Sequence, residues 1–183
     1  MVSHLKPILV PSPSAPAWLS KVIIRLVEEK DLPALEWDGE YRHFRNVFAQ
    51  AWQRSQKGLS VLWVAELLGV GLIGQAFIQL ICDRRELADG KSRAYLYSFR
   101  VRPAYRGQGL GSRILQMVEN DLRQRGFRYV TLNVGKENQR AQEMYKRHGY
   151  HIVAHEPGNW SYVNDEGIII DVHEPAWRME KKL

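Results

Sequence analysis

The sequence has almost no cysteine: among its 183 residues only Cys82 carries a thiol. A disulfide bond within the chain is therefore excluded. Chains without disulfides are typical of reducing compartments, so we expect a cytoplasmic protein. Cys82 shares one alternating apolar face with Ala76, Ile78 and Leu80, and this pattern favours a buried packing thiol over a nucleophile.

Long hydrophobic runs and metal-ligand clusters are also missing. No stretch of about 18 apolar residues occurs, so we expect no membrane-spanning segment. The six histidines show neither an H-x-x-x-H spacing nor a cysteine partner, so we expect no metal site. Residues 1–20 contain the proline- and serine-rich PSPSAP instead of the continuous apolar segment of a secretory signal. We expect a flexible or surface-draped lead-in over residues 1–20 and a single domain over residues 21–183.

The chain lacks blocks of one charge, although it is basic overall. Its net charge of +6 and pI of about 9.5 suit an anionic partner, either a nucleotide cofactor or nucleic acid. Because lysine and arginine are spread along the chain, we expect no nucleic-acid partner. A basic nucleic-acid-associated protein stays as an alternative, and it predicts binding that weakens steeply with added salt.

Apolar periodicity predicts strands and helices in mixed order, without internal repeats. Helices are expected over residues 32–37 with Asp31 as N-cap, over 39–58, from near Ser112 to Gly126, and over 138–149. Strands are expected over residues 21–29, in a hairpin over 60–83 that turns at Gly69–Gly71, and over 93–101, 127–134, 150–156, 167–172 and 176–183. Residues 157–166, with Trp160 and Tyr162, are expected as a loop. This order indicates an α/β or α+β sheet with helices on both faces.

Glycine is concentrated in RPAYRGQGLGS, residues 102–112, between a predicted strand and a predicted helix. The spacing fits neither the G-x-G-x-x-G of a Rossmann turn nor a Walker loop, since no lysine follows the glycines. Backbone N–H groups of Gln108 through Gly111 would face outward from the first turn of the helix, where the helix dipole favours an anion. With Arg106 beside them, these groups predict a seat for a pyrophosphate.

Two stretches together resemble the GNAT superfamily of N-acetyltransferases. In residues 98–116, SFRVRPAYRGQGLGSRILQ, the acetyl-CoA signature is matched by Arg106-Gly107-Gln108-Gly109-Leu110-Gly111, preceded by Val101, Pro103 and Tyr105. In residues 132–150, LNVGKENQRAQEMYKRHGY, the matching residues are Asn138, Ala141, Met144, Tyr145, Gly149 and Tyr150. The resemblance is sharp over residues 94–153, and the predicted order of elements extends it over most of the chain.

The resemblance implies a twisted, mixed, mostly antiparallel sheet that is flanked by helices and splayed between its fourth and fifth strands. Acetyl-CoA would lie in this opening. The backbone of Phe99, Arg100 and Val101 would pair with the pantetheine arm, residues 106–111 would hold the pyrophosphate, and Asn138 would contact the arm. A strand with free N–H and C=O groups suits the two amides of that arm. Homodimers are common in the family, and the late strands are a candidate dimer surface.

The resemblance also assigns an acid and leaves the base open. Tyr145 matches the general acid that protonates the departing thiolate, and an unperturbed tyrosine, with a pKa of about 10, carries a proton at neutral pH. The two positions at which relatives carry a glutamate hold Tyr97 and Asn133. Glu36, Asp38 and Glu40 are candidates from elsewhere. With Trp37, Tyr41 and Phe44 they would form an acidic and aromatic rim for a cationic amine. A water chain or an already neutral acceptor are the other possibilities.

We therefore expect an acetyl-CoA-dependent N-acetyltransferase that transfers acetyl directly to a primary amine, without a covalent enzyme intermediate. The acceptor, a small molecule or a protein, is not identified by the sequence. A non-catalytic module that binds acyl-CoA as a sensor is the main alternative, because both usual glutamates are missing. The preferred acyl chain is also left open, and a longer acyl-CoA fits the same motifs.

Overall fold

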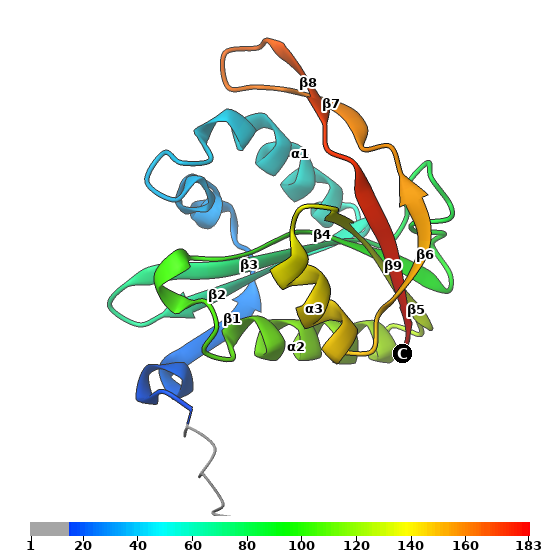
Figure 1. The fold of residues 1–183 in the computed structure, drawn as a ribbon. Coiled ribbons are helices and arrows are strands. Elements are labelled where there is room, and N and C mark those ends of the chain that lie inside the picture. Colours follow the sequence, from blue (N-terminus) through cyan, green and yellow to red (C-terminus); the bar gives the residue numbers. More distant parts are fainter. Residues whose placement is uncertain (1–14) are drawn as a thin grey trace, which may run out of the picture.

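The computed structural model describes residues 15–183 as a mixed sheet with helices on both faces and a two-stranded hairpin beside it (Figure 1). The expected lead-in over residues 1–20 therefore lies largely outside the described residues. The sheet has the strand order β1-β2-β3-β4-β5-β9-β6. Its strands are β1 (Val22–Leu26), β2 (Ser60–Leu67), β3 (Gly71–Gln79), β4 (Arg93–Val101), β5 (Tyr129–Gly135), β6 (His151–Glu156) and β9 (Ala176–Lys182).

The middle of this sheet is open along one line. Every neighbouring pair of strands is antiparallel except β4 and β5, which run parallel. These two strands pair only from Arg93↔Tyr129 to Leu96↔Leu132, and the rest of β4 has no partner on that side. The expected fold, mostly antiparallel and splayed between the fourth and fifth strands, is confirmed.

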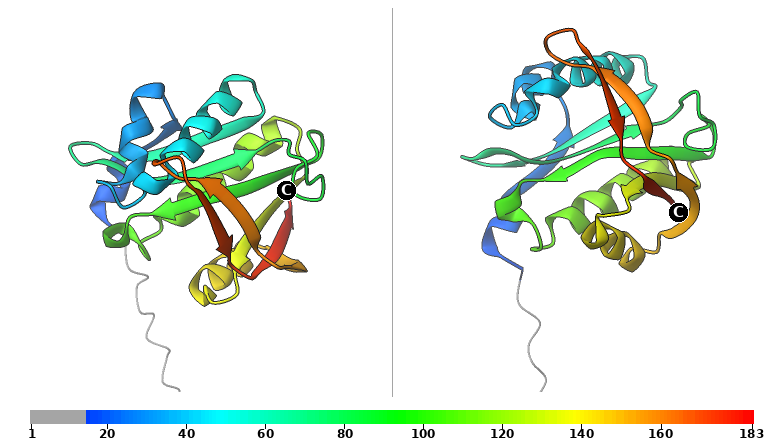
Figure 2. Two further views of the ribbon diagram at one scale, coloured as in Figure 1. Left: turned by 90° about the horizontal axis from the view of Figure 1, so that it is seen from above. Right: turned by 45° about the horizontal axis from the view of Figure 1, so that its top comes forward.

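Helices cover the two faces unequally. Helix α1 (Arg45–Gln56) lies on one face, whereas α2 (Leu110–Gln124) and α3 (Gln139–Arg147) lie on the other (Figures 1 and 2). The predicted apolar stripe of α2 is confirmed, because Ile114, Leu115, Val118 and Leu122 are all buried against the sheet. Each such side chain contributes roughly 1.5–3 kcal/mol to folding, so α2 holds its end of the sheet rigid beneath the opening.

The last part of the chain forms a long two-stranded arm, residues 151–182, in which β7 (Asn159–Val163) continues β6 and β8 (Ile169–His173) leads into β9. The outer half of the arm extends toward α1 (Figures 1 and 2). There Asn46 donates a hydrogen bond to the carbonyl oxygen of Asn164, and the rings of Phe44 and Tyr162 are 4.8 Å apart. The arm therefore connects the sheet edge at β6 to α1, on the side of the sheet opposite α2.

The two halves of the arm touch where each strand is interrupted. Gly158 has a φ of +73° and accepts a hydrogen bond from the Glu174 N–H at 3.0 Å. A Cβ atom at position 158 would lie 1.8 Å from the carbonyl oxygen of Glu174. Only glycine fits this junction, so the sequence Pro157-Gly158 fixes where the arm bends.

Some predicted element boundaries are wrong. Residues 157–166 do not form a simple loop, because β7 occupies most of them and pairs with β8. Helix α1 begins only at Arg45, since Trp37, Asp38 and Gly39 have left-handed φ values of 47°, 60° and 97° that turn the chain first. Helix α2 begins at Leu110 instead of near Ser112, because Gly109, at φ +96°, already serves as its N-cap.

The role predicted for Asp31 is also wrong. Residues Glu29–Glu36 form a 3₁₀ helix whose N-cap is Glu28, and Asp31 lies three residues further on. Its carboxylate accepts a hydrogen bond from the Glu28 N–H at 2.8 Å and pairs with Arg25 at 2.6 Å. Asp31 thus bonds back to the backbone of the N-cap residue, as the acidic residue of a capping box does.

The described residues before β1 support the glycine stretch. Ala17–Lys21 form a 3₁₀ helix, and the ring of Trp18 contacts Tyr105 edge-on at 4.9 Å. The Trp18 Nε1–H donates to Gln108 Oε1 at 3.2 Å. The division between a lead-in and a domain near residue 20 stays a prediction. Within residues 15–183, no helix combines the length and the apolar character that crossing a membrane requires.

Candidate functional site

The unpaired end of β4 forms one wall of the opening. A bulge at Ser98 and Phe99 places two residues opposite one on β3, and Ser98 takes a left-handed φ of 49°. As a result the Phe99 ring faces α2 and α3, with its centroid 6.3 Å from that of Tyr145, while Arg100 points to the α1 face. No neighbouring strand pairs with the second edge of this strand segment, so the pairing of Phe99, Arg100 and Val101 with another extended group stays a prediction.

The glycine turn lies directly beyond β4. Gly107 and Gly109 have φ values of +72° and +96°, which other residues rarely adopt. The first backbone bond of α2 runs from the Arg113 N–H to the Gly109 carbonyl. Helix α2 therefore leaves the N–H groups of Leu110, Gly111 and Ser112 without partners inside the helix, where an anion is favoured.

Gly111 is a glycine that the protein's own packing does not require. Its φ lies outside the left-handed range, and a Cβ atom there would meet Met144 Sδ at 3.6 Å and Phe99 Cζ at 3.8 Å, which are ordinary contacts. Neither the backbone nor the neighbouring side chains thus require glycine at this position. The bare backbone instead allows another group to approach the helix N-terminus closely.

Helix α3 supplies the opposite wall. The Asn138 side chain caps it by accepting a hydrogen bond from the Ala141 N–H at 3.1 Å. Tyr145 lies on the inner side of this helix and is only 7% exposed. Burial raises the pKa of its phenol above the ordinary value, so Tyr145 keeps its proton at any working pH. None of the hydrogen bonds among residues 15–183 uses its hydroxyl group, which leaves it free for a ligand.

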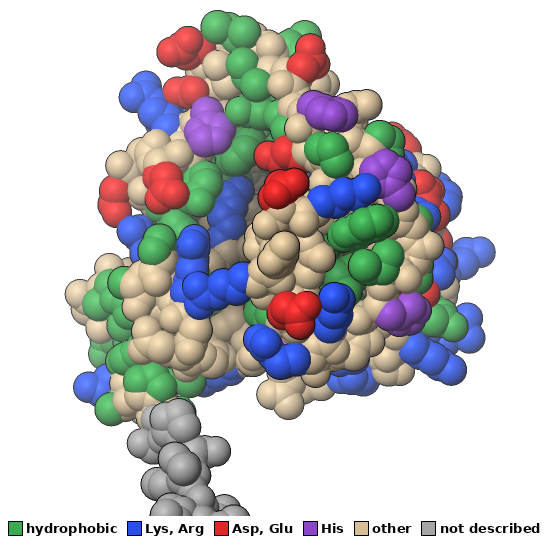
Figure 3. Space-filling model, in the orientation of Figure 1, with side chains coloured by type: hydrophobic (Ala, Val, Ile, Leu, Met, Phe, Trp, Pro, Cys, Tyr) green, Lys and Arg blue, Asp and Glu red, His purple; other side chains and the backbone are tan. Residues whose placement is uncertain are grey.

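These walls enclose a cavity of about 830 Å³, a size typical of small-molecule sites. It is lined by Tyr41, Phe99, Arg100, Val101, Arg106, Gly107, Gly109, Gly111, Ser112, Asn138, Arg140, Ala141, Met144, Tyr145, Arg147 and Glu174. Figure 3 shows basic side chains gathered around this hollow, between α1 and α3. Among the described lining residues four are arginines and one is a carboxylate, so the cavity favours an anionic ligand.

Most of the predicted binding residues meet at this cavity. Gln108 and Leu110 are the two that do not line it: Gln108 donates to the Ala104 carbonyl, and the Leu110 side chain is fully buried in the core. The side chains of these two residues are therefore directed away from the cavity, and only their backbone could contribute to a binding site there. The Arg106 Nε–H donates to the Val101 carbonyl at 2.7 Å, so two predicted ligand-binding residues contact each other here.

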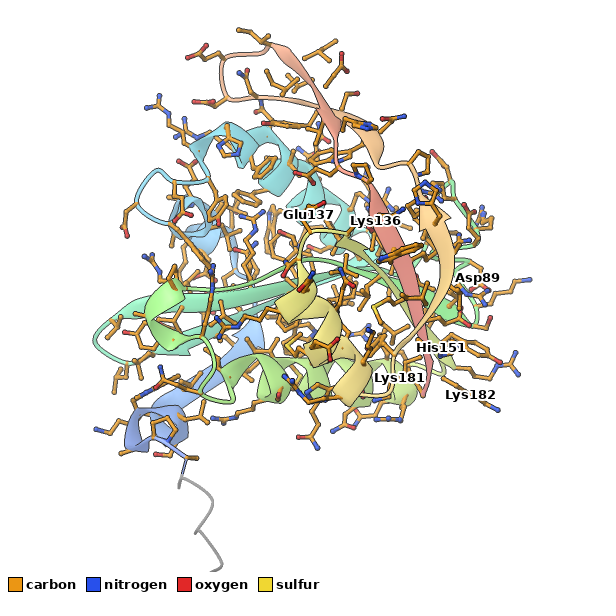
Figure 4. The ribbon with its side chains drawn as sticks, viewed as in Figure 1. Asp89, Lys136, Glu137, His151, Lys181 and Lys182 are labelled. Carbon is orange, nitrogen blue, oxygen red and sulfur yellow. The ribbon has the colours of Figure 1, made fainter. Side chains whose placement is uncertain are left out.

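One other motif residue, Tyr150, and the turn that precedes Asn138 have structural roles. The Tyr150 hydroxyl donates to Glu119 on α2 at 3.0 Å, and Lys181 on β9 pairs with the same carboxylate at 2.6 Å. Glu119 therefore links α2 both to Tyr150 and to β9. Lys136 and Glu137 form the turn between β5 and α3 (Figure 4), and the Lys136 ammonium lies 4.1 Å above the Trp177 ring.

The acids proposed for the rim do not line the cavity. Glu36 is bound by Arg45 at 2.6 Å, and this hydrogen bond holds the pKa of Glu36 below its usual range. Asp38 pairs with Arg102 at 2.9 Å, and Glu40 is exposed. Of the predicted aromatic residues only Tyr41 lines the cavity, since Trp37 is buried and Phe44 lies outside the lining, and the cation over Tyr41 is the protein's own Arg100. The expected acidic and aromatic rim for a cationic amine is therefore wrong apart from Tyr41.

Tyr97 and Asn133, at the usual glutamate positions, also lie outside the cavity lining. Burial raises the pKa of Tyr97 to about 12, which makes it a poor base. Cys82 follows β3 and is half-buried, with its Sγ 3.1 Å from the Arg84 carbonyl oxygen, so the fully buried thiol expected from alternation is wrong. It too lies away from the cavity. Residues 15–183 contain no group of three His, Cys, Asp or Glu side chains that is arranged to hold a metal ion.

Sequence reasoning missed Arg140, Arg147 and Glu174 as lining residues. Arg140 and Arg147 are seven residues apart and so share one face of α3, a spacing that was visible in the sequence. Glu174 gave no such signal. It reaches the cavity only because the arm crosses the opening, which no local pattern reveals.

Comparison with known proteins adds the family. A family model described as the acetyltransferase (GNAT) family matches residues 25–150. A search of curated protein sequences finds no match. Among solved structures, the ribosomal-protein-S18-alanine N-acetyltransferase of Escherichia coli is 22% identical, with a TM-score of 0.65 over 88% of this chain and 93% of that one. The spermidine/spermine N-acetyltransferase SpeG of Vibrio cholerae is 16% identical, with a TM-score of 0.66 over 91% and 95%. At such identities these two structures support the fold alone.

Proposed function

The chain belongs to the GNAT family of acetyltransferases, and from this membership we propose that it transfers acetyl from acetyl-CoA directly to a primary amine. One observation supports the proposal above the others: the free edge of β4, the glycine turn and Tyr145 meet at a single cavity in the splayed sheet. A strand edge suits the amides of a pantetheine arm, and the N-terminus of α2 suits a pyrophosphate.

The residues present fit acetyl-CoA. Gly111 leaves room at the helix N-terminus, and Arg106, Arg140 and Arg147 surround the same end of the cavity. Arginine is well suited to phosphate groups because its N–H donors match their oxygens in pairs. When bound, acetyl-CoA supplies an activated acyl group on sulfur. The protein has to position an amine, accept one proton from its nitrogen and donate one proton to the sulfur.

We assign the two proton transfers to opposite walls. Tyr145 gives its phenolic proton to the sulfur as the carbon–sulfur bond breaks, and burial keeps that proton in place beforehand. Glu174, the one carboxylate among the described lining residues, accepts the proton that the nitrogen loses as the new carbon–nitrogen bond forms. The N–H of Val101, near the free end of β4, is a candidate donor to the carbonyl oxygen as charge develops there.

Replacing Tyr145 tests the proposal. We expect Tyr145→Phe to lower kcat for acetyl transfer by about 100- to 10,000-fold, the usual contribution of a general acid. Binding should persist, because the ring keeps its packing. Saturating acetyl-CoA, at about 100 times its Kd, should stabilise both proteins by about 2.7 kcal/mol in a thermal unfolding assay.

Tyr129→Phe is the matched control, because Tyr129 lies on β5 outside the cavity lining. It should leave kcat unchanged. Unchanged transfer by Tyr145→Phe across a panel of amines would show that the acid is another group. Stabilisation by acetyl-CoA without transfer to any amine would instead favour the acyl-CoA-binding module over the enzyme.

A further inference from the structure

The four arginines of the cavity fall into two sets. Arg106 belongs to the glycine turn, and Arg140 and Arg147 lie on α3 beside it, with Arg140 Nη2 only 2.8 Å from where a Cβ on Gly107 would be. These three suit the phosphate groups of coenzyme A. Arg100 lies on β4, and the bulge at Ser98 directs its side chain to the other face of the sheet. The proposed cofactor site does not account for it.

Arg100 lies among rings that belong to the α1 side of the molecule. Its guanidinium carbon is 3.9 Å from the centroid of the Tyr41 ring and 5.3 Å from that of Phe44. Both Tyr41 and Arg100 line the cavity, whereas Phe99 and Tyr145 line it from the face that carries α2 and α3. Arg100 therefore faces the part of the cavity that is left for the acceptor.

Arg100 carries a largely buried charge that forms no ion pair, and the exposed Glu40 offsets it only from a distance. Its Nη2 donates to the neutral Ser98 hydroxyl at 3.2 Å, while Nη1 is buried without a partner. No ion pair among residues 15–183 includes Arg100. Burial lowers the pKa of this guanidinium, which reflects the cost of the uncompensated charge. The facing aromatic rings offset part of the free energy of burying this charge, and a bound anion would offset the rest.

The surroundings of Arg100 are polar as well as charged. Gln75, its cross-strand partner on β3, is completely buried and donates to the same Ser98 hydroxyl at 2.9 Å. Gln75 Oε1 has no partner either. Two unpaired polar atoms around one strained serine are expensive in an apolar layer, and of the two only the Arg100 Nη1 can donate to an anion.

We propose that the acceptor carries a carboxylate near its amine, as an amino acid does, and that Arg100 binds this carboxylate. The inference rests on the proposed function, since it names the acceptor class of the same site. A guanidinium matches a carboxylate through two parallel hydrogen bonds. The carboxylate reaches Nη1 by displacing the Tyr41 ring, which itself lines the cavity. A polyamine, by contrast, would place a second cation beside Arg100 and be repelled.

Matched acceptors test the inference by binding as well as by turnover. Each of several amino acids is compared with its carboxamide and with the amine that lacks the carboxyl group. Binding to the protein saturated with CoA, which has no acetyl group to transfer, is measured by calorimetry, and kcat/KM with acetyl-CoA is measured by release of the CoA thiol. We expect the free carboxylate to be preferred by about 10- to 100-fold, the usual value of a charge-assisted hydrogen bond.

Variants of Arg100 then link the preference to this side chain. Arg100→Gln should reduce the preference to about threefold or less, and Arg100→Lys should keep part of it, because the charge remains but the two parallel bonds do not. Arg128→Gln, at an exposed site just before β5 and outside the cavity lining, should keep all of it. Stabilisation by acetyl-CoA checks that each variant is folded.

The outcomes separate the two proposals. Carboxylate-dependent binding without any acetyl transfer upholds the Arg100 site and overturns the proposed reaction. Transfer to carboxamides or polyamines that equals or exceeds transfer to the amino acids overturns the inference and upholds the reaction. A preference that survives in Arg100→Gln also overturns the inference, because it assigns the carboxylate to another group.

Discussion

At the scale of single residues, Glu174 and Tyr145 divide the proposed chemistry between an exposed group and a buried one. Glu174 is exposed and held through its backbone N–H by Gly158, whereas Tyr145 is packed between Phe99 and Tyr150. An exposed carboxylate can release its proton to solvent after each turnover. A buried phenol does not lose its proton to hydroxide or buffer in the solvent. In this arrangement one proton passes from the amine to Glu174, and the other passes from Tyr145 to the sulfur.

We predict that Glu174→Gln lowers kcat/KM by about 100-fold or more near neutral pH, within the range of general-base catalysis. The loss should shrink as pH rises, because an increasing fraction of the acceptor amine is then neutral without help. The measurement is a pH profile of kcat/KM for both proteins. Tyr145 will not limit activity on the alkaline side, because its raised pKa keeps the phenol protonated there.

Glu166→Gln serves as the comparison, since Glu166 is an exposed acid on the same arm but outside the cavity lining. It should leave the profile unchanged. A Glu174→Gln profile parallel to the wild-type curve at every pH would assign the base to another group or to a water chain.

At the scale of elements, the arm is the part that completes the cavity. It brings Glu174 to the opening and attaches to α1 through Asn164 and Tyr162. Its geometry depends on the junction of Gly158 with the Glu174 backbone, where no side chain fits. Changes at this junction should therefore affect both stability and the acceptor side of the site.

We predict that Gly158→Ala destabilises the protein by about 2–4 kcal/mol, because a left-handed φ and a clash with backbone atoms both have to be relieved. The displaced arm should also raise the KM of the acceptor more than that of acetyl-CoA. Urea unfolding and steady-state kinetics with both substrates measure the two effects.

Gly167→Ala is a close control on the same arm. Gly167 has a similar φ of +81°, but nothing lies within 4 Å of the added Cβ atom. Only the backbone strain of about 1 kcal/mol is then expected. Equal losses in the two variants would mean that the junction at Gly158 contributes nothing beyond its φ.

The elements that could be predicted from the sequence are those with strong local signals. Residues 93–101 and the apolar stripe of α2 gave clear periods, and the glycine turn has its own chemistry, so both motif stretches were located correctly. The strand β7 was missed because Pro157-Gly158-Asn159 and Asn164-Asp165 are typical of turns. Its partner β8 supplies the pairing, and that partner is not visible locally.

The candidate site divides in the same way. Asn138, Tyr145 and the glycine turn belong to contiguous motifs, so their convergence followed from the family pattern. The direction of the Arg100 side chain depends on the bulge at Ser98, and the position of Glu174 depends on the crossing of the arm. Both are consequences of tertiary structure, which the residue types alone do not encode.

At the scale of the whole molecule, buried tyrosines set the response to alkaline conditions. Burial raises the pKa of Tyr95 and of Tyr97 to about 12, and it raises the pKa of Tyr145 and of Tyr150 as well. Unfolded tyrosine ionises near pH 10. The stabilisation from these four groups is therefore complete below about pH 10 and is lost as pH rises toward their pKa values in the folded protein.

We predict that the free energy of unfolding falls by up to about 5 kcal/mol per pH unit above pH 10, since each of the four protons contributes about 1.4 kcal/mol. Urea unfolding between pH 8 and about 11.5 measures this slope. Absorbance of tyrosinate should show that four of the eight tyrosines ionise only together with unfolding. Tyr145→Phe should reduce the slope by one quarter. Normal titration of all eight groups in the folded protein would contradict the prediction.

The strand order has a consequence for how the molecule is made. Strand β9 is the last sheet strand along the chain, yet in the sheet it lies between β5 and β6. A ribosome delivers residues 15–156 first, so the emerging chain holds the edges of β5 and β6 apart with no strand to join them. Such unpaired edges attract other chains until they are covered. The wall of the cavity that carries Glu174 is thus completed last, after the glycine turn and Tyr145 have already been synthesised.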